Sequence, residues 1–292
     1  MTNLEYIASY TLPGTSVQGI MFTPKYIYYI DATLGIVRYE LLTGEYVSES
    51  TYTNCYGIVL FKNELYAASY DGYLRIYDAD TLTYRGAISL GIDITAYHMT
   101  LYGHYVWIAC GTHLLKVNLV SRETEVNVNH ANSCLDVLVS DEQLAIVWPG
   151  RGVVSIADEA TQTEQSTITT TDEPRALCIN DGVISIAYLG GVELYSANGE
   201  SYDSITEING NALTSANLIR YADDVLLIAY SDTMRVDFIY AYHHTETVGT
   251  EDSIVGSTDI IVGQDDLDVG TQTYVEIERE ALPKYAYTVT RD

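Results

Sequence analysis

An apolar segment that ends in a turn returns about every forty residues along the chain. Its first copy spans residues 25–31 (KYIYYID), and six copies follow one another with spacings of 40, 40, 39, 40 and 42 residues between their turns. A unit of this length cannot bury an apolar face alone, so neighbouring units must pack against one another. The period therefore predicts a ring or a stack of similar units. The six turns lie at Asp31, Asp71, Gly111, Gly150, Gly190 and Asp232.

A second strand-like segment follows each turn and can be aligned among the six copies. In every copy one position is polar and both of its neighbours are apolar. This alternation predicts a strand with one face in a core and the other in water. The polar positions are Arg38, Arg75, Lys116, Ser155, Glu193 and Asp237.

Two further strands complete each unit. A third begins after turns such as residues 42–45 (LTGE) and 78–81 (DADT), which carry the Gly and Asp that tight turns favour. A fourth precedes the apolar segment, as in residues 57–61 (GIVLF). Four strands in about forty residues are typical of a β-propeller blade, so we expect an all-β fold.

The N-terminus predicts how the ring closes. Residues 4–12 are similar to residues 82–90, which form an outermost strand leading into the next blade. We therefore expect the chain to begin with the last strand of the closing blade, whose inner strands are residues 258–262, 271–278 and 285–290. This gives one domain, 1–292, of seven four-stranded blades. The alternative is six blades, with residues 251–292 as a C-terminal appendage, because these match the repeat poorly.

Residues 78–86 (DADTLTYRG) resemble the corner between the third and fourth strands of YVTN-type and quinoprotein-like propellers. The resemblance covers the repeat pattern over residues 4–250 and implies the fold. It implies little about function, because such propellers include enzymes, scaffolds and adhesins.

Charge and hydropathy exclude several kinds of partner. The 40 acidic and 14 basic residues give a net charge of −26, which disfavours nucleic acid, since phosphate binding needs clustered Lys and Arg. No apolar run reaches the roughly 18 to 20 residues of a membrane helix, so membrane insertion is not expected. The charge suits a halophilic setting or simple solubility. No secretory signal is visible at the N-terminus.

No motif for catalysis or for a cofactor occurs, so the chain is not expected to be an enzyme. The four cysteines (Cys55, Cys110, Cys134 and Cys178) are far apart, which predicts free buried thiols. Asp265, Asp266 and Asp268 supply hard oxygen ligands that could hold Ca²⁺, but the EF-hand spacing is absent and a solvated acidic turn is the favoured interpretation.

Binding residues are expected where the propeller turns and the links between blades share one face. The chain has 27 Tyr and 3 Phe, which also favours a surface made for contact. Arg151 and Arg175 are the best candidates for an anion or partner contact, unless neighbouring aspartates neutralise them. The predicted rim comprises Asp31, Asp71, Asp93, His113, His130, Arg151, Asp172, Arg175 and Asp232.

These features predict a non-catalytic propeller that binds other proteins of an assembly, a host receptor or a glycan. A Lys-poor, Tyr- and Thr-rich chain without a leader resembles virion proteins of phages and archaeal viruses in style, which favours a virion surface, capsid-decoration or tail component. One alternative is a cytoplasmic protein-interaction scaffold. Another is a glycan- or lactone-active hydrolase with carboxylates in the central tunnel.

Overall fold

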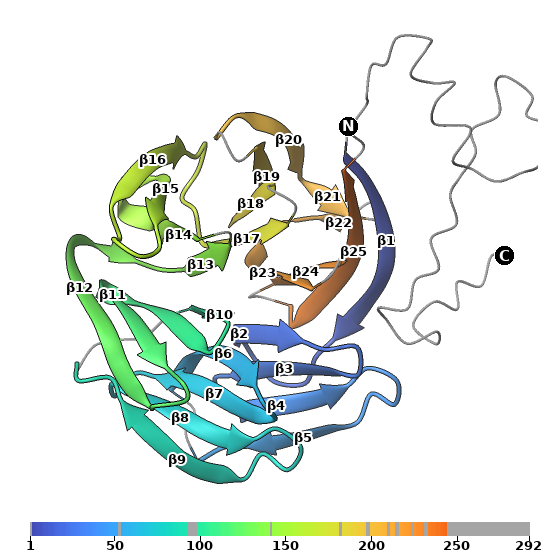
Figure 1. Ribbon diagram of the computed structural model, residues 1–292. Coiled ribbons are helices and arrows are strands. Elements are labelled where there is room, and N and C mark those ends of the chain that lie inside the picture. The colour runs from blue at the N-terminus through green and yellow to red at the C-terminus, as the bar shows by residue number, and fades with distance from the viewer. Residues whose placement is uncertain are drawn as a thin grey trace, which may run out of the picture.

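The chain forms a β-propeller, as its repeat predicts: six sheets surround a central axis in the computed structural model (Figure 1). The structure describes residues 2–243 apart from 52–53, 93–97, 141, 181–182, 197–198, 209–210, 214–215, 223–224 and 231–232. Within these residues the single helical element is the short 3-10 helix η1 (Pro149–Arg151). No helix in this part of the chain is long and apolar enough to cross a membrane.

Four blades are continuous antiparallel sheets of four strands. Blade 1 consists of β2 (Val17–Phe22), β3 (Tyr26–Asp31), β4 (Gly35–Glu40) and β5 (Tyr46–Glu49). Blade 2 consists of β6 (Cys55–Phe61), β7 (Glu64–Ser69), β8 (Tyr73–Asp78) and β9 (Tyr84–Ser89). Blade 4 consists of β13 (Val137–Ser140), β14 (Gln143–Trp148), β15 (Val153–Asp158) and β16 (Glu164–Thr169). Blade 5 consists of β17 (Ala176–Asn180), β18 (Val183–Tyr188), β19 (Gly191–Ser196) and β20 (Ser201–Ile205).

Blade 3 reaches the same architecture with three segments, of which two are long: β10 (Met99–Tyr102), β11 (Tyr105–Asn118) and β12 (Glu123–Cys134). A strand of 14 residues would extend about 45 Å if straight. The Leu119 amide instead donates to the His104 carbonyl at 2.9 Å, so the two ends of β11 lie side by side. β11 therefore doubles back and fills both middle positions of the blade.

Blade 6 closes the ring with the two ends of the described chain. Its order is β23 (Ala216–Ala222), β24 (Val225–Tyr230), β25 (Arg235–His243) and then β1 (Thr2–Thr11). β1 pairs antiparallel with β25, from Thr2 opposite His243 to Thr11 opposite Arg235 (Figure 1). The prediction that the N-terminal strand completes the last blade is confirmed. A small hairpin of β21 (Glu207–Ile208) and β22 (Asn211–Ala212) precedes this blade.

The described residues form six blades, which matches the six-blade alternative and does not support the prediction of seven. The sixth repeat unit has three strands of its own and takes β1 as its outer strand, so no seventh blade is needed to hold β1. The strands expected at 258–262, 271–278 and 285–290 lie outside the described residues, as does the acidic segment 251–292.

The recurring polar position, which lies in the third strand of each blade, is buried in four of the six copies, contrary to the prediction of a face in water. Both faces of a blade pack against neighbouring blades, so the alternation separates two buried faces. Each buried polar group then needs a partner. Asp237, for example, accepts a hydrogen bond from the Tyr230 hydroxyl at 2.8 Å. Four of the six positions are buried, namely Arg75, Ser155, Glu193 and Asp237.

Several buried tyrosines likewise provide hydrogen-bond donors in the interior. The buried hydroxyl of Tyr29 donates to the Pro13 carbonyl at 2.7 Å, and that of Tyr195 donates to Glu193 at 2.5 Å. Tyrosine thus supplies an apolar ring and a donor to the spaces between strands. Packing explains these tyrosines without a contact surface.

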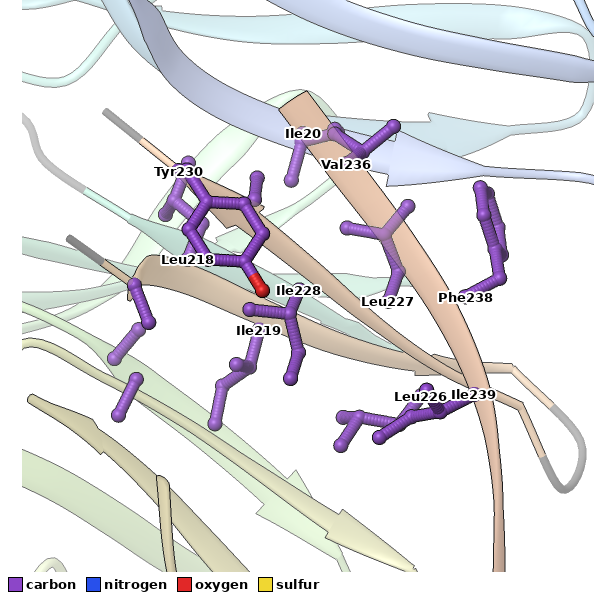
Figure 2. Packing of buried hydrophobic residues seen from close by; sticks show 14 of the residues in the cluster. Ile20, Leu218, Ile219, Leu226, Leu227, Ile228, Tyr230, Val236, Phe238 and Ile239 are labelled. Carbon is purple, nitrogen blue, oxygen red and sulfur yellow. The ribbon is translucent and has the colours of Figure 1, made fainter. Parts of the chain in front are cut away.

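Apolar contacts between blades form the core. In Figure 2, Leu227 of β24 and Val236 and Phe238 of β25 lie beneath β2, which contributes Ile20. Close approach of the inner strands also requires Gly19, because a Cβ there would lie 2.1 Å from the Tyr56 carbonyl oxygen. The four cysteines are buried and free, as predicted.

One turn recurs between the third and fourth strands. The side-chain oxygen of Asp78 accepts the Thr81 amide at 2.9 Å, and Asp158 does the same for Thr161 at 2.7 Å. The residue four positions after the first residue of the turn, for example Leu82 after Asp78, then has a left-handed backbone conformation. This residue is Gly44, Leu82, Arg122 or Gln162 in the first four blades, with φ of 71°, 56°, 61° and 56°.

Candidate functional site

Some side chains of the predicted rim have a structural role, and others are free to contact a ligand. Asp31 is buried and accepts hydrogen bonds from the Thr15, Ser16, Thr33 and Leu34 amides and from the Thr33 hydroxyl. Burial alone would raise the pKa of this carboxyl, but the hydrogen bonds together lower it to about 2. Asp31 therefore joins the link before β2 to the turn after β3. It has no free oxygen to offer a ligand.

The other members are scattered around the ring. Asp71 pairs with Arg75 of its own blade, and Asp172 accepts the Glu173 amide at 2.7 Å. His113 is held by Asn127, with 2.6 Å between Nδ1 and Oδ1. Arg175 is half-buried at the start of blade 5. Asp93 and Asp232 lie outside the described residues, as do Asp265, Asp266 and Asp268.

Among the rim residues that the structure describes, His130 and Arg151 line the same cavity. Both line a cavity of about 220 Å³ between blades 3 and 4. β12 is longer than the outer strands of blades 1, 2, 4 and 5, and its last residues contact η1. His130 comes from this extension, whereas Arg151 ends η1. We call this space the interblade cavity.

A chain of hydrogen bonds runs along its wall. The Trp148 indole donates to the Ser155 hydroxyl at 2.9 Å, and this hydroxyl donates to Glu164 at 2.5 Å. The same Glu164 oxygen lies 3.7 Å from Arg151 Nη1. Glu164 is thus oriented by a buried hydroxyl on one side and faces a guanidinium on the other. Arg151 and Glu164 are both partly exposed, so they can exchange this contact for one with a ligand.

His130 contributes an unsatisfied nitrogen. The His130 ring makes a T-shaped contact with the Trp148 ring, with 4.9 Å between the ring centroids. Nε2 is buried and has no hydrogen-bond partner among the described residues. Burial, reinforced by nearby His113, lowers the pKa of His130, so the ring is neutral at pH 7. A neutral ring can accept or donate a hydrogen bond at Nε2.

The cavity does not suit glycoside hydrolysis. That reaction needs two carboxyl groups on opposite sides of the scissile bond, and Glu164 is the single carboxylate among the described residues that line the cavity. Within the described chain, no group of three or more His, Cys, Asp or Glu side chains could hold a metal ion.

Sequence reasoning missed a second cluster, at the propeller axis. Asp136 is 1% exposed, and its Oδ2 lies 3.3 Å from Arg220 Nη1 and 3.5 Å from His98 Nδ1. The carboxylate also accepts the Leu177 amide at 3.1 Å and the Val137 amide at 2.9 Å. Burial would raise its pKa, but the charges of Arg220 and His98 and these hydrogen bonds lower it. The available signal was the presence of charged residues in or beside apolar inner strands.

Comparisons with known proteins agree with the fold and do not extend to function. No known protein family matches the chain, and no curated protein matches its sequence. Among solved structures the chain is similar to the computationally designed protein Ika8, with a TM-score of 0.50 and 10% identity, over 80% of this chain and 99% of that one. A similarity at this level of identity shows the propeller fold alone.

Proposed function

We propose that the protein is a non-catalytic binding propeller whose interblade cavity holds one sugar unit of a neutral glycan. The observation that carries the proposal is the unpartnered, neutral His130 Nε2 in a cavity that also presents Arg151 and Glu164. A buried polar atom without a partner is costly, so a ligand hydroxyl placed there stabilises the complex.

The charges favour an uncharged, hydroxylated ligand. Arg151 and Glu164 compensate each other, so neither charge is left unpaired for a charged ligand. The cavity offers an acceptor in Glu164, a donor in Arg151 and amides that do both in Asn132 and Gln162. Sugar hydroxyls donate and accept, so they match this mixture.

The size favours a single ring. A volume of about 220 Å³ is below the roughly 300–1,000 Å³ of sites for drug-sized ligands. It corresponds to about seven waters at roughly 30 Å³ each, which a sugar ring with its hydroxyls would displace. Longer glycans would extend past the partly exposed Arg151 into solvent.

Titration with a panel of neutral and acidic monosaccharides, followed by NMR, tests the proposal. At least one neutral sugar should bind. Replacement His130→Phe keeps the ring but removes Nε2, and should weaken binding about tenfold, the loss of roughly one hydrogen bond. His113→Phe in the same sheet is the matched control and should bind as the wild type does. Binding of acidic sugars alone, or equal effects of the two variants, would contradict the proposal.

The biological setting stays a prediction. A glycan-binding propeller is compatible with a virion surface or tail component that contacts a host, but no described contact depends on that setting. Co-purification with capsid or tail proteins in virus particles would support it. Presence in host cytosol alone would favour the cytoplasmic scaffold instead.

A further inference from the structure

A second cavity, also of about 220 Å³, lies at the propeller axis between the inner strands. Its walls come from β2, β6, β10 and β23, the inner strands of blades 1, 2, 3 and 6. The lining is apolar except for Thr100 and Arg220, and includes Met21, Leu60 and Met99. We call this space the axial cavity.

We infer that the axial cavity binds a small apolar carboxylate, with Arg220 receiving the carboxylate group. This site is separate from the interblade cavity, and the inference does not depend on the glycan proposal. It rests on which side of the Arg220–Asp136 pair faces the cavity, and on which guanidinium nitrogens are already used.

The pair presents its positive member to the cavity. Arg220 lines the cavity and its side chain is 17% exposed, whereas Asp136 is 1% exposed and is absent from the lining. No carboxylate is present among the described lining residues. An arriving anion therefore meets the guanidinium first, in apolar surroundings where a charge-assisted hydrogen bond is strong.

The guanidinium retains donors for a ligand. Its two described hydrogen bonds both use Nη1, to Asp136 Oδ2 at 3.3 Å and to the Ile219 carbonyl at 2.7 Å. Nε and Nη2 have no partner among the described residues. These two nitrogens form one edge of the planar group and can hold both oxygens of a carboxylate. The two bonds at Nη1 keep the group oriented.

The apolar walls determine the chemistry of the part of the ligand that is not the carboxylate. Met21, Phe22, Leu60, Met99 and Leu101 favour an uncharged hydrocarbon body, and methionine side chains adapt to aromatic rings. The volume equals about seven waters at roughly 30 Å³ each. Benzoate, with one small ring and one carboxylate, is therefore a suitable probe.

Calorimetric titrations with benzoate, benzyl alcohol and benzamidine test the inference. These probes share the ring and differ in charge. Benzoate should bind at least tenfold more tightly than benzyl alcohol, and benzamidine should not bind. Equal binding of benzoate and benzyl alcohol, tighter binding of benzamidine, or no binding of benzoate would overturn the inference.

Two variants test whether benzoate binds in the axial cavity. The double variant R220Q/D136N removes both charges of the pair while conserving the size of the two side chains. It should lose the tenfold preference for benzoate. Met21→Trp fills the cavity and keeps both charges, and should abolish benzoate binding even if the double variant does not fold. Arg38→Gln, which removes an arginine of β4 that does not line the axial cavity, is the control and should leave binding unchanged. Unaltered benzoate binding by Met21→Trp would overturn the inference.

Discussion

Asp136 and Arg220 meet at the propeller axis, with 3.3 Å between Oδ2 and Nη1, although 84 residues separate them in sequence. Asp136 precedes the inner strand of blade 4, and Arg220 lies in the inner strand of blade 6. The same carboxylate accepts the Leu177 amide of blade 5 and lies near His98 beside blade 3. One buried side chain thus connects four of the six blades.

Replacement Asp136→Ala should lower the free energy of unfolding by roughly 3–5 kcal/mol, because it leaves Arg220 with an uncompensated charge. The double variant R220Q/D136N should be markedly more stable than Asp136→Ala, since it removes both charges together. Urea unfolding measures both. If Asp136→Ala unfolds at the wild-type urea concentration, the pair does not connect the blades.

Asp31 predicts a specific acid sensitivity. Its folded pKa of about 2 is below the ordinary value of 3.8, so its stabilisation is present above about pH 4 and disappears as the pH falls towards 2. The stability difference between the wild type and Asp31→Asn should therefore shrink by roughly 2 kcal/mol over that range, at about 1.4 kcal/mol per pKa unit. Urea unfolding at pH 2.5 to 6 measures it. Asp172→Asn, which changes an exposed carboxylate, is the control and should show a much smaller change.

The recurring turn predicts a stabilising substitution. Arg122 has a left-handed backbone with φ of 61°, which costs about 1–2 kcal/mol for a residue with a Cβ. Arg122→Gly should raise the free energy of unfolding by about 0.5–1 kcal/mol, since the 3.8 Å contact with Glu64 is exposed and weak.

Gly44 occupies the corresponding position in blade 1 and provides the reverse experiment. Gly44→Ala should destabilise the protein by about 1 kcal/mol, although a Cβ there would meet just the Tyr39 hydroxyl, at 3.4 Å. Thermal unfolding would show both shifts. Equal stability of all three proteins would mean that this backbone conformation is not strained.

Closure by β1 predicts complementation in trans. A chain that begins at residue 12 leaves β25 as an open sheet edge, and it should melt at a lower temperature and aggregate. A synthetic peptide of residues 1–11 should restore the melting temperature by pairing with β25. A peptide with the same composition in scrambled order is the control. No loss on truncation would contradict the closure.

The blades could be predicted from local patterns, because each pattern reflects the hydrogen bonds or the packing that a short segment needs. The turn Asp78–Thr81 needs its own hydrogen bonds, and the apolar segment at residues 25–31 needs a packed surface on each side. The similarity of residues 4–12 to 82–90 gave the closing strand for the same reason. The sequence left the number of blades between six and seven, because the number depends on which strand β25 selects as its partner, and no local pattern encodes that selection.

The sites were predicted less well, because they join residues from different blades. Arg151 was selected as a turn residue and His130 as a residue of a link between blades, yet they meet because β12 is extended and contacts η1. Asp31 was selected by the same criterion and is a buried structural group. The axial cluster needed the ring itself, since His98, Asp136 and Arg220 are distant in sequence and become neighbours when six inner strands surround one axis.

The pairing of β1 with β25 also sets the order in which the protein can mature during synthesis. β1 leaves the ribosome before its partner β25, which is among the last described segments to be made. At roughly 5–20 residues per second, β1 waits on the order of tens of seconds. During that time the nascent chain carries an unpaired strand that must avoid the exposed outer strand β5 of blade 1. The ring can therefore close only after β25 has been made, and until then the growing chain is exposed to misassembly.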